Sequence, residues 1–435
     1  MRMKFGFFLL GLGFIILLQG NFVIDVDGLS RYESAVGFFE GKGIDSSKYS
    51  IIGPFFSFPL WLIAKFFNQD PKECMKYYNI ILLVLSLFTL YVFQVKKENW
   101  SNRFFLNFSL LIVTGSMFTK HIHEFYGEVF SSLLMFLAII FLIKDCFIVG
   151  GIFGSLSVAN TPPTLIGFSA LCLLISFEKK QFRYLLIPIL SVTIILLEMY
   201  IRRNFQTGYQ NDFGNKTILP YSGIPGFSYP IVFGILSIFL SFGKGLIFFT
   251  PGIFLPYKKN KDTNRNHLKN LQIFLSSRIF VLGLVIVYAG WWSWYGGWFW
   301  GPRFFLFCSI LSSFLIALHL PERGKSVVGR LILMIAVLIS LWVGFSGIFH
   351  GLENANVCKE GNYKLEFLCW YVPEFSPIFR PFVISFDLID EEGKIFFWFV
   401  VALYLLWDQL NFLIRDLYVL FRKQRSKFQI GSWKF

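Results

Sequence analysis

Residues 291–303 read Trp-Trp-Ser-Trp-Tyr-Gly-Gly-Trp-Phe-Trp-Gly-Pro-Arg, between the apolar runs 273–290 and 304–318. Tryptophan rings favour the headgroup depth of a membrane, and Gly-Gly and Gly-Pro pairs favour tight turns. An aromatic belt with a turn explains the rings, but it does not explain an arginine fixed directly behind Gly-Pro. A guanidinium matches phosphate oxygens bidentately. Arg303 is therefore predicted to bind a phosphate at the membrane surface.

The rest of the chain is also apolar. Hydrophobic residues make up 55% of the 435 residues, charged residues 15%, and the mean hydropathy is +0.60. Apolar runs of membrane-spanning length recur, which predicts an all-α, polytopic membrane helical bundle of about 12 spans in a single domain, 1–435. The predicted spans are 5–23, 77–95, 104–119, 128–143, 146–160, 163–177, 184–201, 231–257, 273–290, 304–318, 327–349 and 395–413.

The net charge of +14 is unevenly divided along these spans. With the N-terminus inside, the inner side carries +17 and the outer side −3. This is the positive-inside bias of a membrane protein, so the excess charge indicates topology and not a nucleic-acid partner. Both termini are predicted to be cytoplasmic.

Residues 51–67 decide this topology. They are apolar but only 17 residues long, and they contain Pro54 and Pro59. If they crossed, most basic clusters would face outward, so they are predicted to form an interfacial or re-entrant helix on the outer surface. The outer loop 24–76 is thus expected to carry juxtamembrane helices, one of them over 29–40, and the last outer loop is 350–394.

Two acids follow the first span. Asp25 and Asp27 are candidates for a base that takes a proton from an acceptor, or for a divalent-cation pair; a solvated helix cap is the structural alternative. Arg31 and Tyr32 add phosphate-type donors beside them. A cation is not favoured, and no cofactor is expected, because the six cysteines and five histidines show no metal-ligand spacing.

A second acidic group precedes the fourth predicted span. Glu124 and Glu128 are four residues apart, so a helix would place both on one face, beside His123. Acids at a helix N-terminus are also favoured by its dipole, which is the structural alternative.

Several basic residues lie on the outer side, where positive charge is sparse. Lys48 with Tyr49, Arg202 and Lys244 are each consistent with snorkelling side chains. Together with Arg303 they are predicted to form an anion site near the outer headgroups.

Cys358 and Cys369 share the last outer loop. A disulfide in an oxidising compartment and two free thiols are both consistent with this placement.

Taken in order, five stretches resemble the polytopic GT-C glycosyltransferases that use lipid-linked sugars, in the group of the protein O-mannosyltransferases and the lipid A aminoarabinose transferases. The stretches are Asp-Gly-Leu-Ser-Arg-Tyr at 27–32, Ser-Lys-Tyr-Ser-Ile-Ile-Gly-Pro at 47–54, the acids of 124–128, Gly-Lys-Gly-Leu at 243–246, and Gly-Gly with Gly-Pro-Arg at 296–303. The resemblance implies a transferase of the cell envelope in the cytoplasmic (inner) membrane of a bacterium, with its active site facing outward. Its partners would be a polyprenyl-phosphate-linked sugar, a lipid, glycan or protein acceptor, and membrane lipids.

The resemblance also implies that an acid in the first outer loop is the catalytic base. Here this would be Asp27, with Asp25 as its rival, and Glu124 and Glu128 match a second acidic position. The last outer loop is shorter than the folded domain that the bigger members carry there, so acceptor recognition is not implied.

The chemistry agrees with this expectation. A polyprenyl phosphate is already a good leaving group, so the reaction needs cationic stabilisation of the phosphate and a base, but no general acid. A lipid or polysaccharide transporter is the alternative, and it would need ionisable residues well inside the spans. A family member without activity that serves as a scaffold is a third hypothesis.

Overall fold

The computed structural model describes residues 2–44, 49–96, 100–205, 226–257, 265–384 and 391–431. Over these ranges the chain is all-α: they contain no β-strand, only isolated bridge residues such as the pair Val23 and Glu124. The predicted all-α class is therefore confirmed.

Five helices are long and apolar enough to cross a membrane: Pro71–Lys96, Phe182–Arg202, Leu268–Ala289, Val327–Phe349 and Glu392–Val419. Further apolar helices of 10–17 residues include Gly127–Ile143, Phe147–Asn160, Ile231–Leu240 and Arg303–His319. The chain thus has the composition and helix lengths of a membrane protein with several spans.

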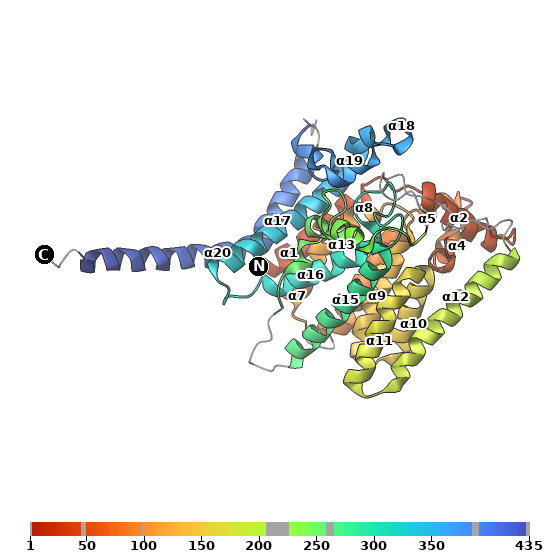
Figure 1. The fold of residues 1–435 in the computed structure, drawn as a ribbon, viewed down its shortest axis with the longest axis horizontal. Coiled ribbons are helices and arrows are strands. Elements are labelled where there is room, and N and C mark those ends of the chain that lie inside the picture. Colours follow the sequence, from red (N-terminus) through yellow and green to blue (C-terminus); the bar gives the residue numbers. More distant parts are fainter. Residues whose placement is uncertain are drawn as a thin grey trace.

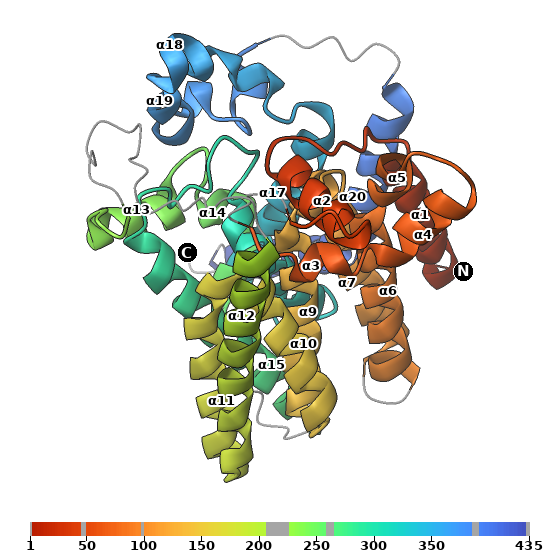
Figure 2. The same ribbon diagram turned by 90° about the vertical axis from the view of Figure 1, so that its right-hand side faces the viewer.

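Long helices run roughly side by side through the body of the molecule (Figure 2). Those most visible in this view are α6 (Tyr78–Leu90), α9 (Gly127–Ile143), α10 (Phe147–Asn160), α11 (Leu165–Lys179), α12 (Leu186–Phe205) and α15 (Arg265–Ala289). The other long elements are α1 (Arg2–Leu18), α7 (Asn102–Thr114), α13 (Ile231–Leu240), α16 (Leu306–His319), α17 (Val327–Phe349) and α20 (Glu392–Gly431), whose C-terminal part projects away from the body (Figure 1).

Short helices gather at one end of this bundle, which is the upper end in Figure 2. They are α2 (Val26–Phe39), α3 (Ile52–Phe55), α4 (Phe58–Phe66), α5 (Pro71–Met75), α14 (Leu246–Phe249), α18 (Glu360–Tyr363) and α19 (Glu366–Tyr371). We call this the upper end; its helices come from segments far apart in the sequence.

The first loop has the short helices expected of it. The predicted helix over 29–40 is observed as α2, which begins three residues earlier. Residues 51–67 form α3 and α4, separated at Phe56 and Ser57. The nine residues of α4 rise only about 13 Å, less than half of the roughly 30 Å of a bilayer core, so α4 alone is too short to cross one. Its exposed side chains include Leu62 and Phe66.

The predicted span 231–257 is wrong as a single helix. It is divided into α13, α14 and a 3-10 turn, Pro251–Phe254, with a break over 241–245. At the break, a side chain on Gly243 would lie 2.0 Å from the carbonyl oxygen of Cys369, so only glycine fits there. The next residue, Lys244, turns its charged side chain into the protein.

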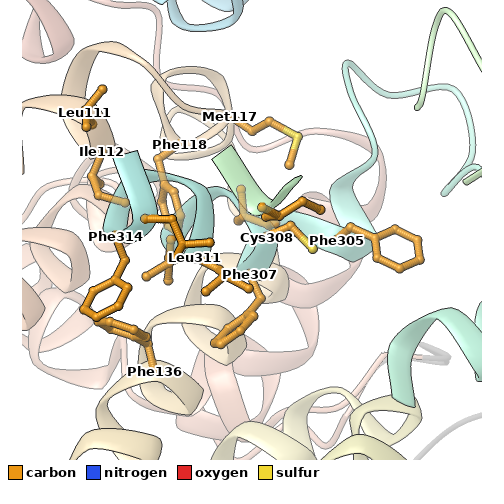
Figure 3. Packing of buried hydrophobic residues seen from close by; sticks show 14 of the residues in the cluster. Leu111, Ile112, Met117, Phe118, Phe136, Phe305, Phe307, Cys308, Leu311 and Phe314 are labelled. Atoms are coloured by element: carbon orange, nitrogen blue, oxygen red, sulfur yellow. The ribbon is translucent and has the colours of Figure 1, made fainter. Parts of the chain in front are cut away.

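Aromatic side chains fill the centre of the bundle. Phe108 of α7, Phe136 of α9 and Phe314 of α16 are each at most 2% exposed, and the Phe136 and Phe314 rings lie 6.3 Å apart (Figure 3). Between membrane helices such rings stabilise the contact mainly through van der Waals packing. Helices α9 and α16 are buried along nearly their whole length, so they form the centre of the bundle. They therefore hold in place the residues at their N-terminal ends.

Candidate functional site

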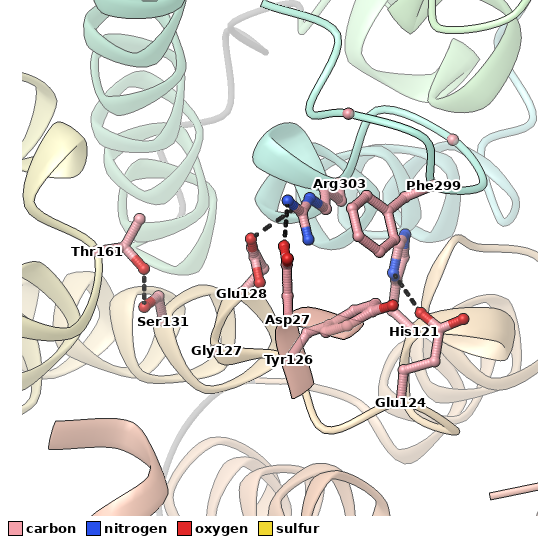
Figure 4. Close-up of polar contacts among 12 residues, drawn as sticks. Asp27, His121, Glu124, Tyr126, Gly127, Glu128, Ser131, Thr161, Phe299 and Arg303 are labelled. Carbon is pink, nitrogen blue, oxygen red and sulfur yellow. Dashed lines mark hydrogen bonds and ion pairs between the residues drawn. The ribbon is translucent and has the colours of Figure 1, made fainter. Parts of the chain in front are cut away.

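A buried ion-pair cluster lies at the upper end, where three distant segments meet. Arg303 Nη2 lies 2.7 Å from Asp27 Oδ2 of α2, and Arg303 Nε lies 3.8 Å from Glu128 Oε1 of α9 (Figure 4). The three side chains are 8%, 15% and 11% exposed. Two of the predicted acids and the predicted arginine therefore come together. We call these three residues the acid–arginine cluster.

Glycines shape the turn that presents Arg303. Gly296, Gly297 and Gly301 have φ of +80°, +78° and +68°, a left-handed conformation that side chains rarely adopt. The turn folds back so that the Arg303 guanidinium lies 3.7 Å from the centre of the Phe299 ring. The guanidinium is thus fixed by stacking as well as by its ion pairs.

Arg31 and Tyr49 extend the cluster. The Arg31 guanidinium lies 4.4 Å from the centre of the Tyr49 ring, and its residue is only 6% exposed. Its Nε and Nη1 atoms are buried and have no hydrogen-bond partner among the described residues. Burial and the hydrogen bond that Tyr49 donates to Asp27 raise the pKa of the Tyr49 hydroxyl, so it stays protonated. The site therefore combines two cations, two carboxylates and a phenol.

Helix α12 holds Tyr49 in place. Arg202 Nη1 donates to the Tyr49 carbonyl at 3.0 Å, and the Ile51 N–H donates to Glu198 Oε1 at 3.1 Å. Arg202 and Glu198 also pair with each other at 3.3 Å. Arg202, predicted as part of an anion site, is thus used to anchor the loop. Lys48 lies outside the described residues.

Asn160 fixes the start of α9, and the sequence pattern gives no sign of this role. Its side chain accepts from the Gly53 N–H at 3.1 Å and donates to the Gly127 carbonyl at 2.8 Å and to Ser131 Oγ at 2.8 Å. These contacts tie α3 and α10 to the residue before Glu128. In the sequence, Asn160 is visible only as the end of an apolar run before two prolines.

Lys244 is not placed where a substrate could reach it. Its residue is fully buried, and its ammonium donates to the carbonyls of Gly297 at 3.2 Å, Phe299 at 2.5 Å and Gly301 at 2.9 Å. All three ammonium hydrogens are used in these contacts. The prediction that Lys244 binds substrate is replaced by a positioning role: Lys244 holds the turn that carries Arg303.

Three further predicted residues lie outside the cluster. Asp25 is exposed, so its pairing with Asp27 as a cation site finds no support. His123 Nε2 lies 2.7 Å from the Leu17 carbonyl and joins the end of α1 to the bundle. Tyr32, predicted as a phosphate donor group, forms a hydrogen bond with the side chain of Asp70. Within the described ranges, no group of three His, Cys, Asp or Glu side chains could hold a metal ion.

The prediction that Glu124 and Glu128 share a helical face is wrong. Glu124 lies in the turn between α8 (Phe118–His121) and α9, because α9 begins only at Gly127. Glu124 instead lies 3.5 Å from Lys120 and 3.9 Å from Nδ1 of His121. Burial lowers the pKa of His121 to about 3, so this histidine is neutral at physiological pH.

The last loop is closed by a disulfide between Cys358 and Cys369, whose Cα atoms are 6.2 Å apart. Of the two alternatives for these cysteines, the structure has the bonded one. The Trp370 carbonyl accepts from the Gly243 N–H at 3.1 Å, and the Trp370 ring lies 4.3 Å from Lys244 Nζ. The disulfide-bonded loop therefore covers the lysine that holds the arginine turn.

Glu366 of this loop is a buried acid that the sequence does not single out. Its residue is 2% exposed, and it accepts from the Tyr295 hydroxyl at 3.4 Å. Burial raises the pKa of the Glu366 carboxyl to about 7, against the opposing effect of the Lys244 charge.

We expect Lys244→Met to destabilise the protein, because three buried carbonyls would lose their donor. The free energy of unfolding should fall by about 2–5 kcal/mol. Denaturant unfolding in detergent micelles, followed by tryptophan fluorescence, would measure it, with the exposed Lys364→Met as the control. Equal stability of both variants and the parent would contradict the positioning role.

We also expect stability to depend on pH through Glu366. The pKa of the Glu366 carboxyl is higher in the folded chain than the ordinary value near 4.5, so the folded state binds this proton more tightly than the unfolded state does. The resulting contribution to the free energy of unfolding is on the order of 3 kcal/mol. It is fully present below pH 4.5 and is lost as the pH rises through 7. Unfolding measured between pH 4.5 and 8 should show a shallower loss for Glu366→Gln. An unchanged slope would exclude this assignment.

No family model, curated protein or solved structure matches the chain. The function is therefore inferred from the site itself and from the resemblance of its motifs.

Proposed function

We propose that this chain is an integral membrane glycosyltransferase. It moves a sugar from a polyprenyl-phosphate donor to an acceptor on the outer face of the membrane, with Asp27 as the base. The observation that carries the proposal is the buried cluster of Asp27, Glu128 and Arg303 beside Arg31, whose Nε and Nη1 have no partner among the described residues. Buried N–H groups without partners are rare, because each costs about 1–3 kcal/mol. An anionic ligand would supply the missing acceptors.

The two guanidinium groups suit the donor phosphate. Arg303 is held by Asp27 and stacked on Phe299, so its orientation is set before the ligand arrives. Arg31 stacks on Tyr49, whose hydroxyl hydrogen-bonds the same carboxylate. Fixed cations of this kind stabilise charge that develops on a departing phosphate without having to reorient.

In the proposed reaction the acceptor oxygen or nitrogen attacks the anomeric carbon of the donor sugar. The bond from that carbon to the phosphate oxygen breaks, and its electron pair leaves with the polyprenyl phosphate, between Arg303 and Arg31. The proton of the acceptor passes to Asp27, whose side chain is the most exposed of the three in the cluster, at 15%. A direct displacement inverts the anomeric configuration.

The proposed topology places the upper end outside. About 12 spans, counting shorter helices such as α9 and α16, with both termini in the cytoplasm, agree with the division of charge in the sequence. The disulfide between Cys358 and Cys369 supports this orientation, because disulfides persist in oxidising compartments. We place the protein in the inner membrane of a bacterium, with the site facing outward.

A transporter is less well supported. The cavity directly beside Glu128, lined also by Ser131 and Thr161, has a volume of about 20 Å³, room for about one water molecule. The charges of the cluster lie at one end of the bundle, where a transferase would use them.

Asp27→Asn should lower transfer by roughly 100-fold or more, because the amide keeps the size of the side chain but cannot accept the proton. The assay is transfer of a radiolabelled lipid-linked sugar, isolated from cells that lack the gene, by purified protein in nanodiscs. The matched control is the exposed Asp25→Asn, which should retain activity. Wild-type turnover by Asp27→Asn would move the base elsewhere.

Arg303→Lys should be impaired although the charge is kept. The ammonium loses the planar fork that can bind two phosphate oxygens and stack on Phe299. Loss of a charge-assisted hydrogen bond, about 1.5–3 kcal/mol, corresponds to a ten- to hundredfold loss in donor affinity or rate.

Donor binding and turnover would be measured for Arg303→Lys and Arg303→Ala, with the exposed Arg183→Lys as the control. Equal activity of all the folded proteins would mean that Arg303 belongs to an aromatic belt and not to an active site.

A further inference from the structure

A second cavity opens at the upper end, beside the acid–arginine cluster. Its volume is about 320 Å³, and its lining includes Lys120, Glu124, Phe299, Trp300, Asn356 and Lys359. Pockets for small molecules usually measure about 300–1,000 Å³. The cavity is therefore large enough for a sugar ring and differs from the one-water cavity beside Glu128.

The lining is chemically mixed. Phe299, which is half-buried, supplies aromatic surface that suits the apolar face of a sugar ring, and the nearly buried Trp300 lies beside it in the lining. Glu124 and Asn356 supply acceptors and donors for hydroxyl groups. A purely lipid-binding groove would not need this set of polar groups.

The cavity also carries an excess positive charge. Lys120 lies 3.5 Å from Glu124, so these two charges largely offset each other. Lys359 lies 5.6 Å from the centre of the Trp298 ring and forms no ion pair with a described residue. One ammonium is thus left for a negatively charged group on the ligand.

Phe299 connects this cavity to the acid–arginine cluster. The Arg303 guanidinium stacks on the Phe299 ring, and the same residue lines the cavity. Figure 4 shows Arg303 on one side of the Phe299 ring and His121 and Glu124 on the other. A ligand in the cavity would therefore lie one aromatic ring away from the proposed donor phosphate.

We propose that this cavity binds an anionic saccharide, a sugar that carries a carboxylate or a phosphate, as the acceptor. Its role as acceptor rests on the proposed function. The binding itself is measured without turnover, so that the two inferences can fail separately.

The test is saturation-transfer NMR on the full-length protein in nanodiscs, with glucuronate, glucose 6-phosphate and glucose as probes. Both anionic probes should bind in the millimolar range, and glucose at least tenfold more weakly. Lys359→Ala should weaken the anionic probes about tenfold, the size expected for one charge-assisted hydrogen bond. Lys364→Ala, an exposed lysine of the same loop that does not line the cavity, is the matched control and should bind as the parent does.

Leu352→Trp provides a second variant, because Leu352 lines the cavity and a larger side chain would fill it. It should abolish binding of the probes without a change of charge. Equal binding of glucose and glucuronate, or no effect of Lys359→Ala and Leu352→Trp, would overturn the proposal, as would the absence of binding by any probe. Asp27→Asn should still bind the probes; if it bound them and also kept full turnover, the proposed base would fail while the acceptor cavity stood.

Discussion

The burial of the Arg303 guanidinium is the constraint on which the upper end of the molecule depends. A charge taken out of water costs several kcal/mol unless counter-charges and hydrogen bonds compensate it. Here the compensation comes from Asp27 of α2 and Glu128 of α9. One side chain thus ties together the first loop, a central helix and the tryptophan-rich turn, which are far apart in the sequence. The ion pairs thereby hold α2 and the turn against the upper end of α9.

The same turn needs a second cation for a different reason. Its left-handed glycines direct three carbonyls, of Gly297, Phe299 and Gly301, toward the interior, where water cannot satisfy them. Lys244 donates to all three, and the disulfide-bonded loop covers it with Trp370. The turn that carries Arg303 is therefore held by hydrogen bonds of defined direction as well as by apolar packing. A site that stabilises developing charge needs this kind of fixed geometry.

The sequence predicts the helices well, and the reason is physical. Apolar runs bounded by Gly, Pro or charged residues leave few alternatives, so α9, α16 and α17 lie within two residues of the predicted spans, whereas α15 begins eight residues before its predicted span. Residues 51–67 were predicted as one interfacial or re-entrant helix, because 17 residues with two prolines argue against a span; the structure divides them into two short helices.

The roles of single polar residues were harder to predict, because they depend on partners distant in the sequence. Lys244 lies in an apolar run and has a basic side chain, so the sequence indicates an anion ligand; only the fold reveals the three carbonyls that it meets. Asn160 closes an apolar run, yet it holds the start of α9. Glu124 and Glu128 have helical spacing, but a turn separates them. Local spacing specifies elements, whereas buried polar contacts specify how the elements meet.

The charge balance of the cluster bears on how the proposed base would work. Two guanidinium groups and two carboxylates give a net charge near zero without a ligand, which is the arrangement that an apolar setting tolerates best. A donor phosphate would compete with Asp27 for Arg303. The ion pair that stabilises the resting fold would then be exchanged for a contact with the donor, so the same guanidinium serves both the fold and the proposed reaction.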